Sequence, residues 1–178
     1  MRKFLFLFAL TSWTISLVFH LSALIGDYDI SRQFPFIWLL HIGIFVVWLP
    51  TVLILKNNNE LKDLRQNNIL GFSKHTQFFK IIFRHTPTWL TMVAAIGFIH
   101  SIINFIVIIA IESNTPDIKD GVYILQNHGH FVRTITEMEY NHYSALQLML
   151  FSGHWISFYG IALAVLYPYK TSMQTTQS

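Results

Sequence analysis

Residues 140–169, YNHYSALQLMLFSGHWISFYGIALAVLYPY, decide the fold class, because this run contains no Lys, Arg, Asp or Glu. A helix needs about 20 apolar residues, at about 1.5 Å per residue, to cross the roughly 30 Å apolar core of a bilayer. The run is long enough to do so. Three other charge-free runs, 4–26, 33–55 and 85–111, are long enough as well. The sequence therefore predicts four membrane-spanning helices.

The composition agrees with a membrane protein. Of the 178 residues, 53% are apolar and 12% are charged, whereas about a quarter of the residues of soluble domains are charged. We predict an all-α integral membrane protein with one domain over residues 1–178, built as a four-transmembrane-helix bundle. Its helices are expected at about 4–26, 34–55, 87–111 and 140–167, with a cytoplasmic loop at 56–86 and an outer loop at 112–139. The first run is too long for the apolar region of a signal peptide, about 7–15 residues, so it is expected to be retained as a helix.

The positive charges predict the orientation of the chain. With both termini in the cytoplasm, nine cations lie on that side: Arg2, Lys3, Lys56, Lys62, Arg65, Lys74, Lys80, Arg84 and Lys170. Only Arg32, Lys119 and Arg133 then lie on the other side. Cytoplasmic loops carry the excess of Lys and Arg, so the count predicts a multi-pass protein with cytoplasmic N- and C-termini. The sequence pI of about 9.2 is then explained by topology and anionic lipid head groups, and no nucleic-acid partner is expected.

The cytoplasmic loop contains an amphipathic segment, 73–85. Its apolar residues fall at helical spacing and are surrounded by cations: Phe78, Phe79, Ile82 and Phe83, with Lys74, Lys80 and Arg84. This pattern is typical of a helix that lies in the plane of the lipid head groups. A partner-binding helix of the calmodulin-target type is the alternative. The polar part before it, 57–68, is expected to be a connector with a short helix through 60–64.

Small and polar residues at helical spacing predict which side of each helix meets the others. On the first helix this side carries Ala9, Trp13, Ser16, His20, Ala23 and Asp27. On the second it carries Phe34, Ile37, His41, Trp48 and Val52, and on the third Val93, Gly97, His100, Asn104 and Val107. The fourth helix is expected to start near Thr134 or Thr136 and to use Gly153, Ser157, Gly160 and Ala164 for close approach. Pro35 suits the first turn of the second helix, whereas Pro50 is expected to kink or end it.

Apart from His142 at the start of the fourth, each predicted helix carries one histidine: His20, His41, His100 and His154. Ionisable residues inside a membrane are costly, so they are candidates for a functional site. Counted from the helix ends, His100 pairs by depth with His154, and His20 pairs with His41. Two imidazoles at one height on facing helices can ligate haem b, with Gly97 and Gly153 making room for the macrocycle. The alternative is that each imidazole hydrogen-bonds a carbonyl, Ser16, Asn104 or Ser157 across a helix contact.

The outer loop offers a second candidate site. His128, His130, Glu137, Glu139 and His142 include the spacings His-x-His and Glu-x-x-His. Both spacings are found among ligands of zinc, copper and carboxylate-bridged metals. The candidate metal ligands are His128, His130, Glu139 and His142. The alternative is that these side chains are only solvated.

The chain contains no cysteine, which excludes disulfides, iron–sulfur clusters and covalently attached haem. No phosphate-binding loop or nucleophile–base motif is present. The leading expectation is a small accessory or scaffold subunit of the membrane, without catalysis, in contact with the bilayer, with membrane protein partners or with copies of itself. The alternative is haem b or transition-metal binding, for electron transfer, through one histidine per helix. Ligand binding requires two or more imidazole nitrogens to converge, whereas structural histidines each find their own partner.

Overall fold

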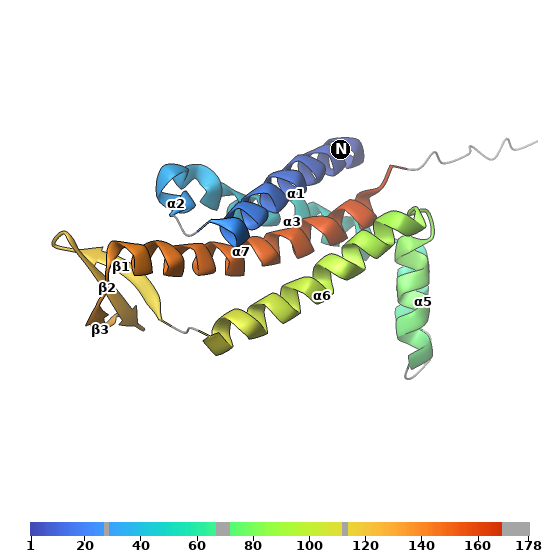
Figure 1. Cartoon of the computed structure of the whole chain (residues 1–178). Helices are drawn as coiled ribbons and strands as arrows, with labels where there is room; N and C mark the ends of the chain where they lie inside the picture. The colour runs from blue at the N-terminus through green and yellow to red at the C-terminus, as the bar shows by residue number, and fades with distance from the viewer. Residues whose placement is uncertain (27–28, 67–71, 112–113, 169–178) are drawn as a thin grey trace, which may run out of the picture.

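The computed structural model describes residues 1–26, 29–66, 72–111 and 114–168, and 78% of it is helical (Figure 1). Four segments are long and apolar enough to cross a membrane. They are helix α1 (Arg2–Ile25), the 3₁₀ turn η1 (Pro35–Trp38) with helix α3 (Leu39–Lys56), helix α6 (Thr88–Ile111) and helix α7 (Glu137–Leu166). The four predicted helical spans are confirmed.

Helix α7 is the centre of the bundle. It contacts α1, α3 and α6, and in Figure 1 it runs between α1 and α3 on one side and α6 on the other. Within the described chain, 67% of its most apolar window is buried, against 22–28% in the other three spans. The other helices therefore keep a wide apolar surface, which a bilayer accommodates without cost because lipid tails are equally apolar.

The helix contacts are lined with small residues, which let backbones approach closely. The predicted small side of α7 is buried at Gly153, Ser157, Gly160 and Ala164. On α1, the predicted side is buried at Ala9, Ser16, His20 and Ala23, with Ser12 beside them, while Asp27 lies outside the described residues. On α6, Gly97 and Asn104 are buried together with Ala94 and Ser101, but His100 and Val107 are exposed.

The predicted side of the second span was right only in part. Ile37 is buried and Trp48 is half-buried, but Phe34, His41 and Val52 are exposed. Helix α3 instead buries Gly43, Ile44, Val47 and Thr51. The apolar residues of this helix cover its whole circumference, so their spacing does not distinguish the side that meets protein from the side that meets lipid. Pro35 lies in the first turn of η1, as predicted, and α3 continues through Pro50 to Lys56.

The connections at the end of the bundle that holds both Arg2 and Leu166 are helical. Helix α4 (Asn59–Gln66) and helix α5 (Phe72–Phe83) follow α3, so both helices predicted in this loop are present. Figure 1 shows α5 crossing the direction of α6 at a large angle. We call this end of the molecule the α5 end. Arg2 donates hydrogen bonds to the carbonyls of Val165 (2.8 Å) and Leu166 (3.3 Å), which ties α1 to the last turn of α7.

The opposite end, which we call the sheet end, corrects the prediction of an all-α fold, because the outer loop predicted at 112–139 contains three strands. Strands β1 (Thr115–Lys119), β2 (Val122–Asn127) and β3 (His130–Thr134) form an antiparallel sheet in the order β1-β2-β3. Asp120 and Gly121 connect the first two strands, and both have positive φ, 52° and 78°. Two-residue hairpin turns of type I′ require positive φ at both positions, and Asp-Gly is a preferred pair there. Asp120 and Gly121 therefore favour the tight turn that brings β1 and β2 together.

The start of α7 links the sheet to the bundle. The hydroxyl of Thr136 accepts a hydrogen bond from the backbone N–H of Glu139 (3.2 Å), and the Glu139 carboxylate accepts one from the backbone N–H of Thr136 (2.8 Å). This reciprocal pair is a capping box. It confirms the predicted start of the fourth helix. The short helix α2 (Ile30–Gln33) lies nearby, where the hydroxyl of Tyr140 donates to the buried carboxylate of Asp29 (3.2 Å).

Candidate functional site

Two of the four candidate cofactor ligands, His20 and His100, meet. The Nε2 atoms of His20 on α1 and His100 on α6 lie 3.0 Å apart, and the two rings are nearly perpendicular, at 88°. The Nδ1 atom of His20 lies 2.8 Å from the hydroxyl oxygen of Ser152 on α7. His20 is 4% exposed, so its imidazole is enclosed by these contacts. One side chain from each of three helices therefore takes part in a single hydrogen-bonded chain.

The following placement of protons satisfies every contact of this chain. The Ser152 hydroxyl donates to the carbonyl of Leu148 (2.7 Å), so its oxygen accepts from Nδ1–H of His20. The Nε2 atom of His20 then carries a lone pair and accepts from Nε2–H of His100. A neutral imidazole has one N–H and one lone pair, so both nitrogens of His20 are occupied. The remaining lone pair, on Nδ1 of His100, lies on an exposed side chain.

Asn104 supports the α6–α7 contact one turn beyond His100. Its side-chain amide donates to the carbonyl of Met149 (2.9 Å). A Cβ atom at Gly153 would lie 2.6 Å from the Nδ2 atom of Asn104, so only glycine leaves room for this amide. Ser152 and Gly153 thus act together, because one binds the imidazole of α1 and the other admits the amide of α6.

The pairing of histidines by depth was wrong. His20 meets His100, whereas His41 and His154 each have a different partner. His41 on α3 accepts a hydrogen bond at Nδ1 from the indole N–H of Trp155 (3.2 Å). His154 donates from Nδ1 to the carbonyl of Leu150 in its own helix (2.7 Å). Depth was counted from the helix ends, but Figure 1 shows that α6 runs obliquely to α7, so the helix ends do not lie at common levels.

The candidate metal ligands of the outer loop are placed at the sheet end. His128 and Gly129 form the turn between β2 and β3, with φ of 49° and 82°, and His130 begins β3. Their His-x-His spacing therefore belongs to a hairpin. Glu139 accepts from Arg133 on β3 (2.8 Å) besides its role in the capping box, and its carboxylate raises the pKa of Arg133.

The structure does not bring these ligands together. Across the described ranges, no group of three or more His, Asp or Glu residues is close enough to hold a metal ion. Glu137 and Glu139 both lie in the first turn of α7, and the ring of His142 packs against Tyr143 one turn further on (centroids 5.8 Å apart). The hairpin and the capping box account for this cluster without a metal.

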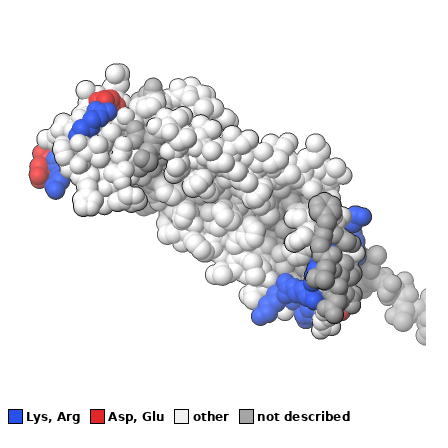
Figure 2. Space-filling model, turned by 90° about the horizontal axis from the view of Figure 1, so that it is seen from below, with Lys and Arg blue, Asp and Glu red and all other residues white. Residues whose placement is uncertain are grey.

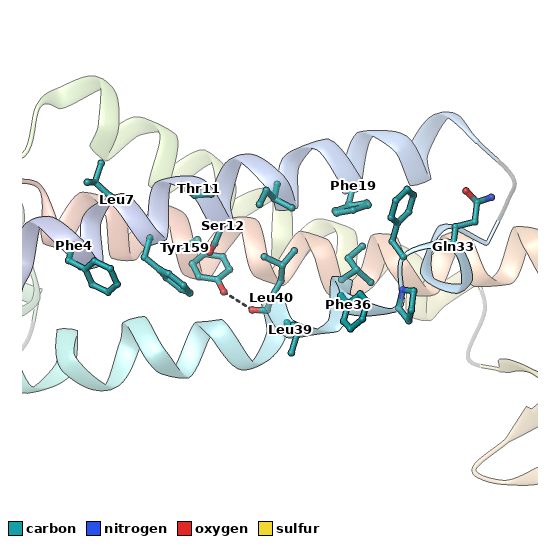
Figure 3. A pocket seen from close by; sticks show the side chains of 15 residues that line it. Phe4, Leu7, Thr11, Ser12, Phe19, Gln33, Phe36, Leu39, Leu40 and Tyr159 are labelled. Carbon is teal, nitrogen blue, oxygen red and sulfur yellow. Dashed lines mark hydrogen bonds between the residues drawn. The ribbon is translucent and has the colours of Figure 1, made fainter.

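A groove between α1 and α3 was not predicted from the sequence. It has a volume of about 890 Å³ and is lined mainly by apolar side chains, with Thr11, Ser12, Gln33 and Tyr159 as its polar members (Figure 3). The Tyr159 hydroxyl donates to the carbonyl of Leu40 (2.6 Å), as the dashed line in Figure 3 marks. It comes close enough to α3 only because residue 43 is glycine. The lining residues come from α1, α2, η1, α3 and α7, so no local pattern in the sequence marks the groove.

These arrangements bind helices to one another through imidazole, hydroxyl, amide and indole groups. The chain also has no detected likeness that would assign it a function: it matches no protein family model, no curated protein and no solved structure.

Proposed function

We propose that this protein is a multi-pass integral membrane protein with its N- and C-termini in the cytoplasm. The four apolar spans support this reading. Figure 2 adds that, on the face it shows, Lys, Arg, Asp and Glu gather at the two ends of the molecule and leave a wide band free of them. Cations dominate the α5 end, which holds Lys56, Lys62, Arg65, Lys74 and Lys80, and the excess of Lys and Arg faces the cytoplasm in most membrane proteins.

The absence of cysteine makes the orientation testable by labelling. Single substitutions Lys62→Cys at the α5 end and Ser31→Cys at the opposite end introduce the only thiols of the chain. In intact cells, a membrane-impermeant maleimide is expected to label the cysteine at position 31 and not the one at position 62. Labelling at position 62 alone would reverse the orientation.

We further propose that the protein is an accessory or scaffold subunit that associates with another membrane protein. The observation that carries this proposal is that the histidine nitrogens form hydrogen bonds within the chain itself. Both nitrogens of His20, Nδ1 of His41 and Nδ1 of His154 bond to groups of the same chain. The bonds of His20 and His41 join different helices, and such interhelical hydrogen bonds stabilise a membrane bundle by about 0.6–2 kcal/mol each. The histidines therefore fit a structural role.

The outer surface of α6 is the part of the bundle best suited to a partner helix. It exposes large apolar residues around His100, namely Ile96, Ile99 and Ile103 (63%, 57% and 56% exposed). The Nδ1 atom of His100 is a polar group on this apolar surface. A polar atom facing lipid tails is unfavourable, so a partner that forms a hydrogen bond with it stabilises the association.

Site-specific photocrosslinking in native membranes tests the accessory role. A photoreactive side chain at Ile99 or Ile103 is expected to give a discrete protein adduct. The same group at Leu49, which is 65% exposed on α3, serves as the matched control and is expected to react with lipid. The proposal fails if the α6 positions yield only lipid adducts.

The convergence of His20 and His100 favours a second candidate, ligation of haem b or a transition metal. These are the two nitrogens of the helix histidines that approach one another in the described chain. Metal–imidazole bonds are about 2.0–2.1 Å long, so nitrogens on opposite sides of an ion lie about 4 Å apart. The observed 3.0 Å is instead within the range of a direct hydrogen bond. Haem binding would require α1 and α6 to separate.

An absorption spectrum of the detergent-purified protein, oxidised and reduced, distinguishes the two candidates when combined with metal analysis. The accessory role predicts a colourless protein without stoichiometric metal. A Soret band that His100→Ala abolishes would establish the second candidate instead. His154→Ala is the matched control, because the hydrogen bond that His154 makes in the described chain is to its own helix and its ring contacts Phe105.

A further inference from the structure

A second cavity lies at the α5 end, between α5 and the first turns of α6. It is an open hollow with a volume of about 540 Å³. Its lining combines hydroxyl groups, one cation and two aromatic rings: Thr76, Thr86, Thr88, Thr91, Lys80, Phe79 and Phe83. None of the lining residues is acidic. The cavity therefore offers donors and a positive charge beside an apolar surface.

The walls of the cavity are fixed by contacts to the rest of the bundle. The Thr86 hydroxyl donates to the carbonyl of Ala164 in α7 (2.6 Å), which holds the turn between α5 and α6. Arg84 at the end of α5 forms an ion pair with Glu60 on α4 (2.7 Å). The rings of Phe79 and Phe83 stack with an interplanar angle of 3°. These contacts hold α5 and the start of α6 in place, and so maintain the large angle between the two helices that Figure 1 shows.

Lys80 is the cation in the lining of this cavity, and its ammonium group is available to bind a ligand. Arg84 is neutralised by Glu60, whereas Lys80 has no hydrogen bond or ion pair within the described parts of the chain. The hydroxyl of Thr88 is likewise without a partner there. An exposed ammonium group and a free hydroxyl on opposite walls of one cavity are suited to phosphate oxygens, which accept charge-assisted hydrogen bonds.

We propose that this cavity binds the head group of one anionic phospholipid. Lys80 and Thr88 hold the phosphate, and the acyl chains run over Phe79 and Phe83 toward the apolar band of the bundle. Phe79 is 56% exposed, so it offers a surface that a soluble phosphate would not use. The site goes beyond the accessory role but rests on the proposed position of the chain in a membrane.

Native mass spectrometry of the full-length protein in detergent tests the site, with phosphatidylglycerol and phosphatidylcholine of identical acyl chains as the probes. The wild type is expected to retain phosphatidylglycerol in preference. A basic residue near a lipid surface contributes roughly a fivefold increase in affinity, so Lys80→Gln is expected to weaken retention by about that factor. Thr88→Val is expected to weaken it as well.

Lys74→Gln is the matched control, because it removes the same charge from the same helix at a residue that does not line the cavity. Equal losses in Lys74→Gln and Lys80→Gln would overturn the site in favour of diffuse attraction to the helix. Equal retention of the two lipids would overturn it as well, and competition by inorganic phosphate would identify a soluble ligand instead. Resistance of the wild type to alkaline carbonate extraction tests membrane insertion separately, and melting temperatures show whether each variant is folded.

Discussion

The side-chain amide of Asn104 on α6 occupies the space that a Cβ atom at Gly153 on α7 would need. That Cβ atom would lie 2.6 Å from the Nδ2 atom of Asn104. The amide donates to the carbonyl of Met149 from this position. The polar contact between the two helices therefore requires glycine at position 153.

Gly153→Ala is expected to destabilise the bundle, because the new methyl group displaces Asn104 and breaks its bond to Met149. Overpacking of a tight contact costs about 1–3 kcal/mol. Gly97→Ala is the matched control on the facing helix, where the nearest atom to the new Cβ lies at 3.5 Å, an ordinary contact distance. Unfolding by SDS in mixed micelles measures both variants. Equal stability of the two would show that Asn104 can move without loss.

Gly43→Ala is expected to destabilise the contact between α3 and α7 for a similar reason, since its methyl group would meet the Tyr159 hydroxyl. Tyr159→Phe removes that hydroxyl and its bond to Leu40, at a cost of about 1 kcal/mol. In the double variant the clash is absent, so the combined loss is expected to be smaller than the sum of the single losses. The same SDS titration measures this coupling, and additive losses would contradict the proposed clash.

The helices could be predicted from the sequence because lipid imposes length and apolarity on every span. Their approximate boundaries follow from charge-free runs and from Pro35, and the structure adds the Thr136–Glu139 capping box, which the prediction did not use. The amphipathic helix before α6 was predictable as well, because its cations and phenylalanines recur at helical spacing. These features depend on residues close together in the chain.

The side of each helix that faces protein was less predictable. Small residues marked the contacts of α1 and α7 correctly, but α3 is apolar all round, so His41 gave a misleading side. The His20–His100 contact depends on the tilt of α6, and no local sequence pattern predicts that tilt. The sheet is different, because Asp120-Gly121 between alternating residues is a strong hairpin signal that the prediction did not use.

His20 and Ser152 are expected to be energetically coupled, because their hydrogen bond joins α1 to α7. A double-mutant cycle of His20→Ala and Ser152→Ala is predicted to give a coupling of about 0.6–1.7 kcal/mol, the range of interhelical bonds in membranes. The cycle of His154→Ala with Ser152→Ala is the control, since His154 bonds to Leu150 in its own helix. A coupling in the control as large as that of His20 would remove the evidence for a specific bond.

Thr136→Ala is expected to destabilise the start of α7 more than Arg133→Ala does. Loss of a Thr cap costs about 0.5–2 kcal/mol, because it removes the side-chain acceptor for a backbone N–H, here that of Glu139. The Arg133–Glu139 ion pair is solvent-exposed, with side chains 46% and 35% accessible, and such pairs contribute about 0–1 kcal/mol. Hydrogen exchange at the first turn of α7 measures the difference locally. Faster exchange in Arg133→Ala than in Thr136→Ala would show that the ion pair, rather than the cap, holds the helix start against the sheet.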